Sequence, residues 1–223
     1  KVAFKETIRK KSDVEYKYKK QSGGHGQYGH VKMTFEPSGD MDTPYVFEQT
    51  VVGGAVPKNF FPAVEKGIAE SVKKGPLAAY PVTGIKAVLY DGSYHPVDSS
   101  EMAFKVATQQ AFKKGIMEAK PVLLEPIATL KVVVPEGYTG DVMGELNKRR
   151  ARVMGMNPTD NGYQEIVADI PYLELYGYNA TLRSMTSGSG TFSYEFARYE
   201  QAPDDVAAKQ IEERASKLVE VEE

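Results

Sequence analysis

Glycine residues crowd the segment 23–30, which reads GGHGQYGH and is followed by Val31. The segment fits G-x-G-x-x-G-x-V, a pattern of dinucleotide-binding turns and of kinase phosphate-covering loops. A dinucleotide site needs a helix at the third glycine, because the pyrophosphate binds the positive end of that helix. Apolar and polar residues alternate from Val31 to Glu36 and predict a strand instead. The dinucleotide interpretation is therefore rejected.

The kinase interpretation fails because the chain contains no H-R-D, no D-F-G and no lysine in a V-A-I-K strand. A P-loop, G-x-x-x-x-G-K-[ST], is also absent from the sequence. Two interpretations of the glycines stay open. One is a flexible hairpin connection, and the other is a backbone that presses against another macromolecule. In the second, polar contacts would come from Gln21, Ser22, His25 and Gln27.

Three histidines, His25, His30 and His95, are the other candidates for chemistry. A metal site needs converging ligands, and no carboxylate is in register with the first two, so we expect no metal site. Ser93, His95 and Asp98 contain the residue types of a hydrolytic triad. All three lie in one six-residue turn, and no nucleophile elbow accompanies them, so chance proximity explains their spacing better than a catalytic triad does.

Two further segments fit contacts with nucleic acid. Tyr94 and His95 lie on a connection between a predicted strand and helix, where they either only link the elements or stack on bases. The run NKRRAR, residues 147–152, places four cations near the end of a predicted helix. They either complement the helix dipole or form a phosphate clamp. Arg183 lies near the end of another predicted helix, at a distance that the sequence does not fix.

Composition indicates an ordinary globular chain of 223 residues with a formal net charge of −2. Residues 1–20 hold eight Lys or Arg against three Asp or Glu, whereas residues 200–223 hold three against eight. The basic end suits phosphate and the acidic end does not. The sequence has no cysteine, which excludes disulfides and thiolate chemistry and agrees with a cytoplasmic location. No apolar run suits a membrane span, and a start without Met leads us to expect a fragment.

Periodicity predicts two domains with mixed α and β structure, separated near Lys120-Pro121. The first should contain strands around 14–18, 31–35, 45–52 and 85–89, and helices around 61–72 and 98–117. The second helix should be capped by Asp98 in a capping box with Glu101. The second domain should contain strands at 127–134, 152–156, 164–170 and 192–196, and helices at 140–150 and 173–184. Their order, β-α-β-β-α-β, is that of a ferredoxin-like fold. A last helix should cover 204–218.

Together these segments resemble translational elongation factor G. The resemblance rests on the strings KETI, QSGGHGQYGHV, VVGGAVPKNFFPAVEKGI, GPLAAYPV, YDGSYHPVDSSEMAFK, KPVLLEPI, GDVMGELNKRRARVMGM and GYNATLRSMTSGSGTFSYEF. Their order is that of the family's fourth and fifth domains and terminal helix, over essentially the whole chain.

The resemblance implies an α+β chain of two domains. Residues 1–120 would form the fourth domain, an elongated α/β module with a left-handed βαβ crossover, an exception to the usual hand. Residues 121–200 would form the ferredoxin-like fifth domain, and residues 201–223 the C-terminal helix and acidic tail. The chain itself would be no enzyme and would hold no cofactor. GTP and magnesium would bind to a missing N-terminal domain of the full-length GTPase.

The resemblance also implies which residues contact RNA. Two tip loops would enter the decoding site of the small ribosomal subunit and contact tRNA and mRNA during translocation. Their residues would be Gln21, Ser22, Gly23, Gly24, His25, Gly26, Gln27, Tyr28, Ser93, Tyr94 and His95. The fifth domain would lie near the GTPase-associated rRNA of the large subunit. Its rRNA contacts would be Lys148, Arg149, Arg150, Arg152 and Arg183. We expect a cytoplasmic monomer with no membrane partner.

Two positions depart from the family pattern. His25 stands where the family commonly has arginine, and Pro96 stands where an acidic residue is common. The first change removes a permanent charge, and the second restricts His95 to extended geometry. They leave open a paralogue that acts in ribosome recycling or in tetracycline-type ribosome protection, or a free-standing RNA-binding module. An independent hydrolase using His95 and Asp98 is the least favoured alternative.

Overall fold

The computed structural model describes residues 3–22 and 24–219, which form two compact units. The first unit comprises Phe4–Leu124 and the segment that begins at Ala202. The second unit comprises Ala3 and Glu125–Gln201. The division falls inside strand β6 (Pro121–Pro135), a few residues beyond the expected junction at 120/121, and the C-terminal segment belongs to the first unit.

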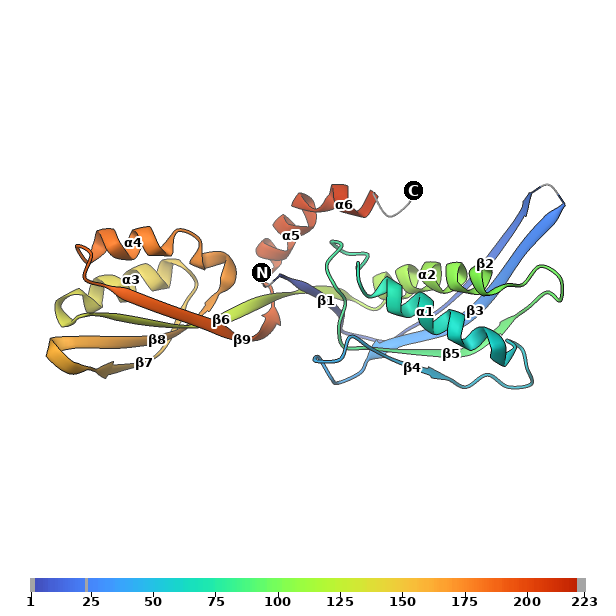
Figure 1. The fold of residues 1–223 in the computed structure, drawn as a ribbon, viewed down its shortest axis with the longest axis horizontal. Coiled ribbons are helices and arrows are strands. Elements are labelled where there is room, and N and C mark those ends of the chain that lie inside the picture. The colour runs from blue at the N-terminus through green and yellow to red at the C-terminus, as the bar shows by residue number, and fades with distance from the viewer. Residues whose placement is uncertain (1–2, 23, 220–223) are drawn as a thin grey trace. The chain divides into compact units, whose positions relative to one another are not determined.

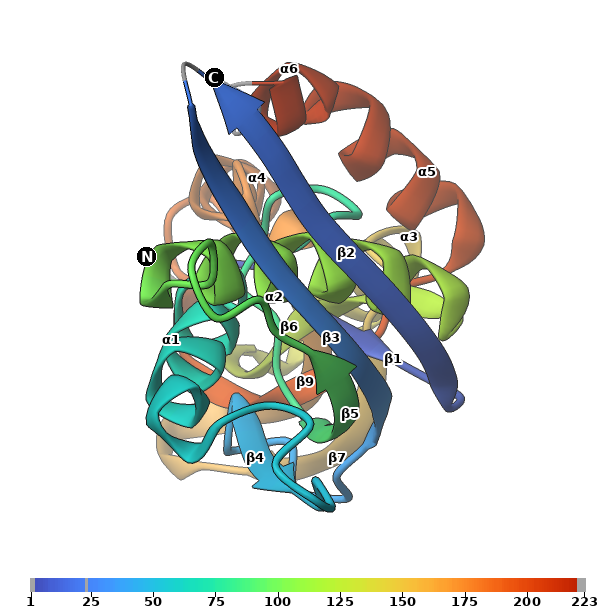
Figure 2. The same cartoon turned by 90° about the vertical axis from the view of Figure 1, so that its right-hand side faces the viewer.

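A four-stranded sheet with the order β2-β3-β5-β4 is the framework of the first unit (Figure 1). β4 and β5 are parallel and the other neighbours are antiparallel, so β4, α1 and β5 form the expected βαβ unit. Helices α1 and α2 pack against each other and against the sheet (Figure 2). The elements are β2 (Ser12–Ser22), β3 (His25–Pro37), β4 (Tyr45–Gln49), η1 (Lys58–Phe60), α1 (Phe61–Ser71), β5 (Ile85–Ser93) and α2 (Glu101–Glu118).

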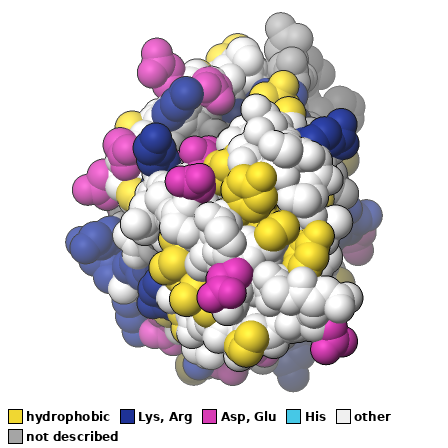
Figure 3. Space-filling view, turned by 90° about the vertical axis from the view of Figure 1, so that its left-hand side faces the viewer, with side chains coloured by type: hydrophobic (Ala, Val, Ile, Leu, Met, Phe, Trp, Pro, Cys, Tyr) yellow, Lys and Arg dark blue, Asp and Glu magenta, His cyan; other side chains and the backbone are white. Residues whose placement is uncertain are grey.

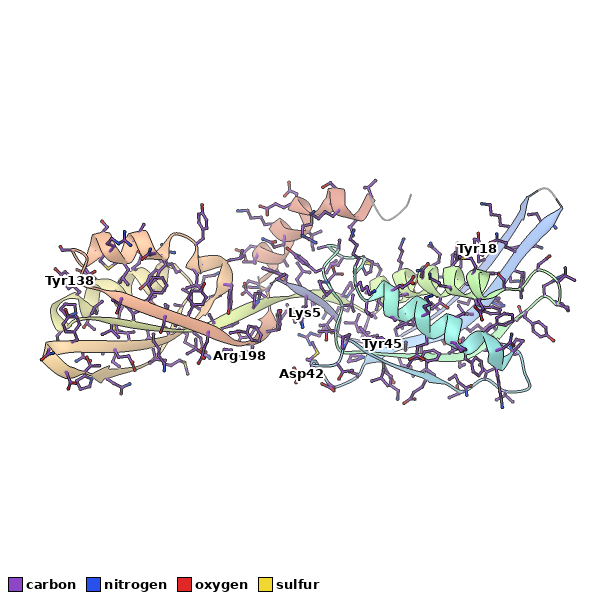
Figure 4. The ribbon with its side chains drawn as sticks, in the orientation of Figure 1. Lys5, Tyr18, Asp42, Tyr45, Tyr138 and Arg198 are labelled. Carbon is purple, nitrogen blue, oxygen red and sulfur yellow. The ribbon has the colours of Figure 1, made fainter. Side chains whose placement is uncertain are left out.

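The predicted alternation of β3 places Val31, Met33 and Phe35 in the core of this unit, where all three are fully buried. The Phe35 ring meets the edge of Phe112 from α2, with 5.7 Å between ring centroids. From β2, Tyr16 and Tyr18 pack against the same core (Tyr18 is labelled in Figure 4). Strand β3 is therefore held on one face by α2 and on both edges by neighbouring strands.

The expected cap of α2 is wrong. Helix α2 begins at Glu101, and its N-cap is Ser100, whose hydroxyl accepts a hydrogen bond from the Ala103 amide at 3.1 Å. Asp98 belongs to the preceding connection, so the predicted capping box with Glu101 does not form. A serine cap serves the same exposed amides as aspartate would, which is why sequence alone placed the start two residues early.

The second unit has the ferredoxin-like fold that the sequence predicted. Its strands have the order β9-β6-β8-β7, and its helices α3 and α4 pack on a core with buried Val132, Val142 and Ile166. The expected helix at 173–184 is interrupted, because Gly177 adopts a φ of +75° and begins a shorter helix. The elements are η2 (Glu136–Tyr138), α3 (Thr139–Lys148), β7 (Arg152–Pro158), η3 (Asp160–Gly162), β8 (Tyr163–Pro171), η4 (Tyr172–Leu175), α4 (Tyr178–Met185) and β9 (Thr191–Gln201).

The C-terminal segment packs on the first unit through α5 (Asp204–Glu213), which is followed by α6 (Ala215–Val219). The single predicted helix at 204–218 is thus divided near Arg214. The Arg214 guanidinium stacks 3.8 Å from the Tyr80 ring centre and donates to the carbonyls of Ala78 and Ala79. Strand β1 (Lys5–Ile8), which the sequence pattern did not predict, pairs with the start of β6 beside it.

Candidate nucleic-acid interface

The glycine segment forms the end of a hairpin, and its strands continue into the range 21–28 that was expected to be a loop. β2 and β3 pair in continuous register as far as Ser22 opposite His25, so only two residues connect the strands. Gly24 adopts a φ of +86°, a conformation that glycine tolerates without strain. Gly23 lies outside the described residues, as do the side chains of Ser22 and His25. The hairpin therefore presents its polar residues from paired strands.

Two of the motif glycines allow this hairpin to lie against the start of α2 and the connection that precedes it. A Cβ atom at Gly26 would come within 2.4 Å of an Asp98 carboxylate oxygen, which belongs to a side chain that can turn away. A Cβ atom at Gly29 would come within 2.5 Å of the Ala103 carbonyl oxygen, which is backbone. Real Cβ contacts are longer, so close packing favours glycine at the first position and requires it at the second. Neither open interpretation of the motif anticipated this internal role.

Two hydrogen bonds, one of them from a side chain, join the hairpin to the connection between β5 and α2. The Tyr28 amide donates to the Asp98 carbonyl at 2.9 Å, and the Ser99 hydroxyl donates to the Tyr28 carbonyl at 2.8 Å. The two segments that the sequence predicted as tip loops are thus neighbours within one unit. In Figure 1 both extend beyond the start of α2. We call this pair of segments, residues 19–28 and 93–99, the tip.

His95 is held by its own loop in a defined orientation. Its Nδ1 atom lies 3.2 Å from the Val97 amide and 3.1 Å from the Asp98 amide, and both amides can only donate. Two amide donors make Nδ1 the acceptor of the neutral ring, whose proton then lies on Nε2, although an Asp98 carboxylate oxygen also lies 3.6 Å from Nδ1. The His95 side chain is half-exposed, so Nε2–H is available as a donor to a ligand.

A small cavity of about 170 Å³ lies at the tip and brings several predicted residues together. Gln21, Gln27, Tyr28 and His95 line it, together with Lys19, Lys20 and Asp98. The last three were not among the predicted site residues. The pairing register of the hairpin could have identified the two lysines, because Lys19 pairs with Tyr28 and Lys20 pairs with Gln27. Tyr94, the other predicted aromatic, is exposed on the same connection.

Ser93 bonds to partners other than His95, in agreement with the expectation that the spacing of these two residues is due to chance. Its hydroxyl lies 2.6 Å from the Tyr28 hydroxyl and 2.7 Å from Nδ1 of His30. Nε2 of His30 in turn lies 2.9 Å from a carboxylate oxygen of Glu15, and the hydrogen bond from His30 lowers the pKa of that carboxyl. Ser93 and His30 thus belong to a polar chain across the sheet, whereas His95 is bonded within its own loop.

The basic run at the end of α3 separates into partly buried and exposed members. Arg149 donates to the carbonyls of Glu174 and Tyr176 and to the hydroxyl of Thr181, all near the start of α4. Arg150 makes two parallel hydrogen bonds to the buried carboxylate of Glu125, at 2.9 and 3.1 Å. Such paired bonds are strong and geometrically specific. These two guanidinium groups therefore stabilise the second unit.

Three other predicted cations of the second unit are exposed. Lys148 ends α3, and Arg183 lies near the end of α4. Arg149 bonds to Thr181 in the first half of α4, whereas Arg183 lies in its last turn. Arg152 shares the carboxylate of Asp169 with Arg198 (labelled in Figure 4) and remains largely exposed. Their contact with rRNA stays a prediction.

Exposed hydrophobic side chains also occur on the second unit. Figure 3 shows such side chains among uncharged ones on the face turned to the viewer. The large exposed hydrophobic residues of this unit are Met154, Met156, Leu173, Tyr176, Tyr194 and Phe196. Across residues 3–22 and 24–219, no group of three or more His, Asp or Glu is placed to hold a metal ion. None of the described helices is long and apolar enough to cross a membrane.

The fold and the tip define a two-unit protein of mixed α and β structure that presents polar side chains from one end of a sheet. Family comparison agrees with both units. Residues 1–120 match the model of elongation factor G, domain IV, and residues 122–210 match the model of the elongation factor G C-terminus. The chain therefore belongs to the elongation factor G family.

Two relatives illustrate the similarity. An elongation factor G-like protein of Thermotoga maritima is 50% identical over 222 residues, which cover 100% of this chain and 32% of the relative. A crystal structure of a protein from Thermus thermophilus has a TM-score of 0.82 and 44% identity, covering 97% of this chain and 32% of that one. The chain thus spans about a third of the length of these relatives.

Proposed function

We propose that this chain is the ribosome-contacting part of an elongation factor G-type GTPase that promotes movement of tRNA and mRNA during protein synthesis. One observation carries the proposal: Gln21, Gln27, Tyr28 and His95 come from two segments and line one cavity at the tip. Amides, a phenol and a fixed imidazole N–H suit hydrogen bonds to unpaired bases, riboses and phosphates. Lys19 and Lys20 add positive charge beside them.

The proposed mechanism is geometric and needs no catalytic group in this chain. The tip occupies the decoding site of the small subunit after tRNA leaves it, and so disfavours backward movement of tRNA and mRNA. GTP and magnesium bind to another domain of the longer protein. The exposed cations Lys148, Arg152 and Arg183 contact rRNA of the GTPase-associated region on the large subunit. The site of action is the cytoplasm, where we expect the protein to be a monomer.

The absence of native cysteine permits a direct test of placement. Gln27→Cys introduces one thiol at the tip, to which an iron chelate that generates hydroxyl radicals is attached. With 70S ribosomes, we expect cleavage of small-subunit rRNA at the decoding site. Lys131→Cys, at an exposed position of β6, is the matched control and should leave that rRNA intact. Equal cleavage from both positions, or none from Gln27→Cys on bound ribosomes, would refute the placement.

A ribosome-recycling or ribosome-protection role is the second candidate. Pro96 favours it, because proline restricts the backbone of His95 at the tip, where the family commonly has an acidic residue. The two roles differ in their products. A translocase moves tRNA and mRNA by one codon, whereas a recycling factor separates ribosomal subunits and a protection factor releases bound drug. Measuring all three outcomes with the longer protein separates the candidates.

A further inference from the structure

A second basic concavity lies on the first unit, between the C-terminal end of α1 and the middle of α2. It has a volume of about 280 Å³. Lys73 and Lys74 line it from the turn that follows α1, and Lys113 lines it from α2. The remaining lining residues are Glu70, Ser71, Gln109, Gln110 and Phe112. We call it the α1–α2 cavity. No residue of the tip takes part in it.

The three lysines of this cavity have no carboxylate partner in the part of the chain that the structure describes. The one carboxylate at the cavity, Glu70, is already bonded to Lys105 at 2.9 Å and to the Gln109 amide at 3.1 Å. The hydrogen bond from Lys105, together with nearby positive charge that includes Lys73, lowers the pKa of Glu70. The cavity therefore carries an uncompensated positive charge.

Helix stability alone does not explain this arrangement. Cations at the end of a helix do complement its dipole, which would account for Lys73 and Lys74. However, Lys113 comes from the interior of a different helix and faces the same cavity. Three like charges around one concavity repel one another unless an anion lies between them.

We propose that the α1–α2 cavity binds a phosphodiester of RNA, as a second contact that depends on the proposed function. The lining donors are lysines and glutamines on flexible side chains, which suit contact with a sugar–phosphate backbone without reading sequence. Lys113 lies 12 residues beyond the start of α2, or about 18 Å along the helix axis. An RNA held at the tip can therefore extend along α2 and place a backbone phosphate in the cavity.

The salt dependence of RNA binding tests this contact. Anisotropy of a fluorescein-labelled RNA duplex is measured with the full chain between about 50 and 200 mM KCl. The test variant replaces Lys73, Lys74 and Lys113 with glutamine. The control replaces Lys58, Lys209 and Lys217, which are exposed elsewhere on the same unit, so both variants lose the same charge. We expect the slope of log affinity against log salt to fall by about 2 to 3 in the test variant and to change little in the control.

Equal slopes for the two variants would overturn the proposal, because diffuse attraction would then explain binding. Inorganic phosphate provides a second arm, read from amide NMR shifts of residues 70–74. If phosphate shifts these amides in the wild type while the test variant keeps the wild-type RNA slope, the cavity binds a free anion and the RNA proposal is wrong. Circular dichroism verifies that both variants fold. The decoding-site cleavage by Gln27→Cys is independent of this slope, so each proposal can fail alone.

Discussion

At the scale of single residues, the chemistry of the tip depends on which polar atoms already make hydrogen bonds within the protein. Nδ1 of His95 is occupied by two backbone amides of its own loop, and Nε2–H remains available. Ser93 is bonded to Tyr28 and His30 instead of His95. A free donor without an activated nucleophile suits recognition of an acceptor on RNA, rather than hydrolysis.

The tautomer of His95 follows from these bonds and is measurable. Nitrogen-detected NMR of the imidazole at neutral pH should show the proton on Nε2. His95→Asn keeps an acceptor close to the position of Nδ1, so it should preserve the loop, whereas His95→Ala should loosen it. The measurement is amide exchange of Val97 and Asp98, which we expect to rise in His95→Ala only. A proton on Nδ1 would contradict the hydrogen-bond assignment.

Gly29 tests the close contact between β3 and α2. Gly29→Ala would bring a Cβ within 2.5 Å of the Ala103 carbonyl, so we expect a loss of about 1–3 kcal/mol in the free energy of unfolding. Gly144→Ala is the matched control, because Gly144 lies inside α3 with no heavy atom within 4 Å of the added Cβ. It should gain about 0.5–1 kcal/mol. Urea denaturation gives both values, and like signs would refute the packing argument.

At the scale of elements, the C-terminal helix α5 is attached to the first unit through a loop ordered by a buried carboxylate. Glu6 is fully buried and accepts hydrogen bonds from the amides of Leu77, Ala78 and Tyr80 at 2.8–2.9 Å. Arg214 then donates to two carbonyls of that loop and stacks on Tyr80. In this loop, Glu6 accepts hydrogen bonds from the backbone amides, and Arg214 donates hydrogen bonds to the backbone carbonyls.

Arg214→Ala should release α5 from this loop. It removes two hydrogen bonds and a cation–π contact, so we expect a loss of about 2–4 kcal/mol in the free energy of unfolding. Arg214→Lys keeps the charge but not the planar fork, and should recover only part of that loss. Hydrogen exchange in Asp204–Glu213 provides the local readout. Unchanged protection of these amides in Arg214→Ala would contradict the proposed attachment.

Glu6 gives a pH dependence of defined sign. Burial raises the pKa of its carboxyl above 4.5, despite three backbone donors that act in the opposite direction. Between 4.5 and the raised pKa the native state binds more protons than the unfolded state, so this group makes stability fall as pH rises through that window. Glu6→Gln should lack this component. The wild-type advantage over Glu6→Gln in urea denaturation should therefore shrink as pH rises from about 4. An increasing advantage would contradict the burial argument.

Periodicity predicted most elements, since each depends on residues close in sequence. The strand alternation of residues 31–35 and the β-α-β-β-α-β order are confirmed. Periodicity could not predict contacts between residues that are distant in sequence. Arg150 bonds to Glu125, and Arg149 bonds to backbone near Glu174, so a run that resembled a phosphate clamp is partly internal. Likewise, the close approach of Gly29 to Ala103 depends on tertiary packing that the motif does not encode.

At the scale of the whole molecule, each unit carries its own candidate RNA surface. The first unit carries the tip and the α1–α2 cavity, and the second carries exposed cations on α3, α4 and β7. The chain spans about a third of the length of its relatives. Under the proposed function, both units would contact ribosomal RNA.

The most direct test of this account is single-turnover translocation by the longer protein carrying His95→Ala, followed beside ribosome-stimulated GTP hydrolysis. Loss of a hydrogen bond at the tip should slow translocation by about tenfold, equivalent to about 1.4 kcal/mol, and leave GTP hydrolysis largely intact. Translocation at the wild-type rate would contradict the account, because the tip would then have no part in moving tRNA and mRNA.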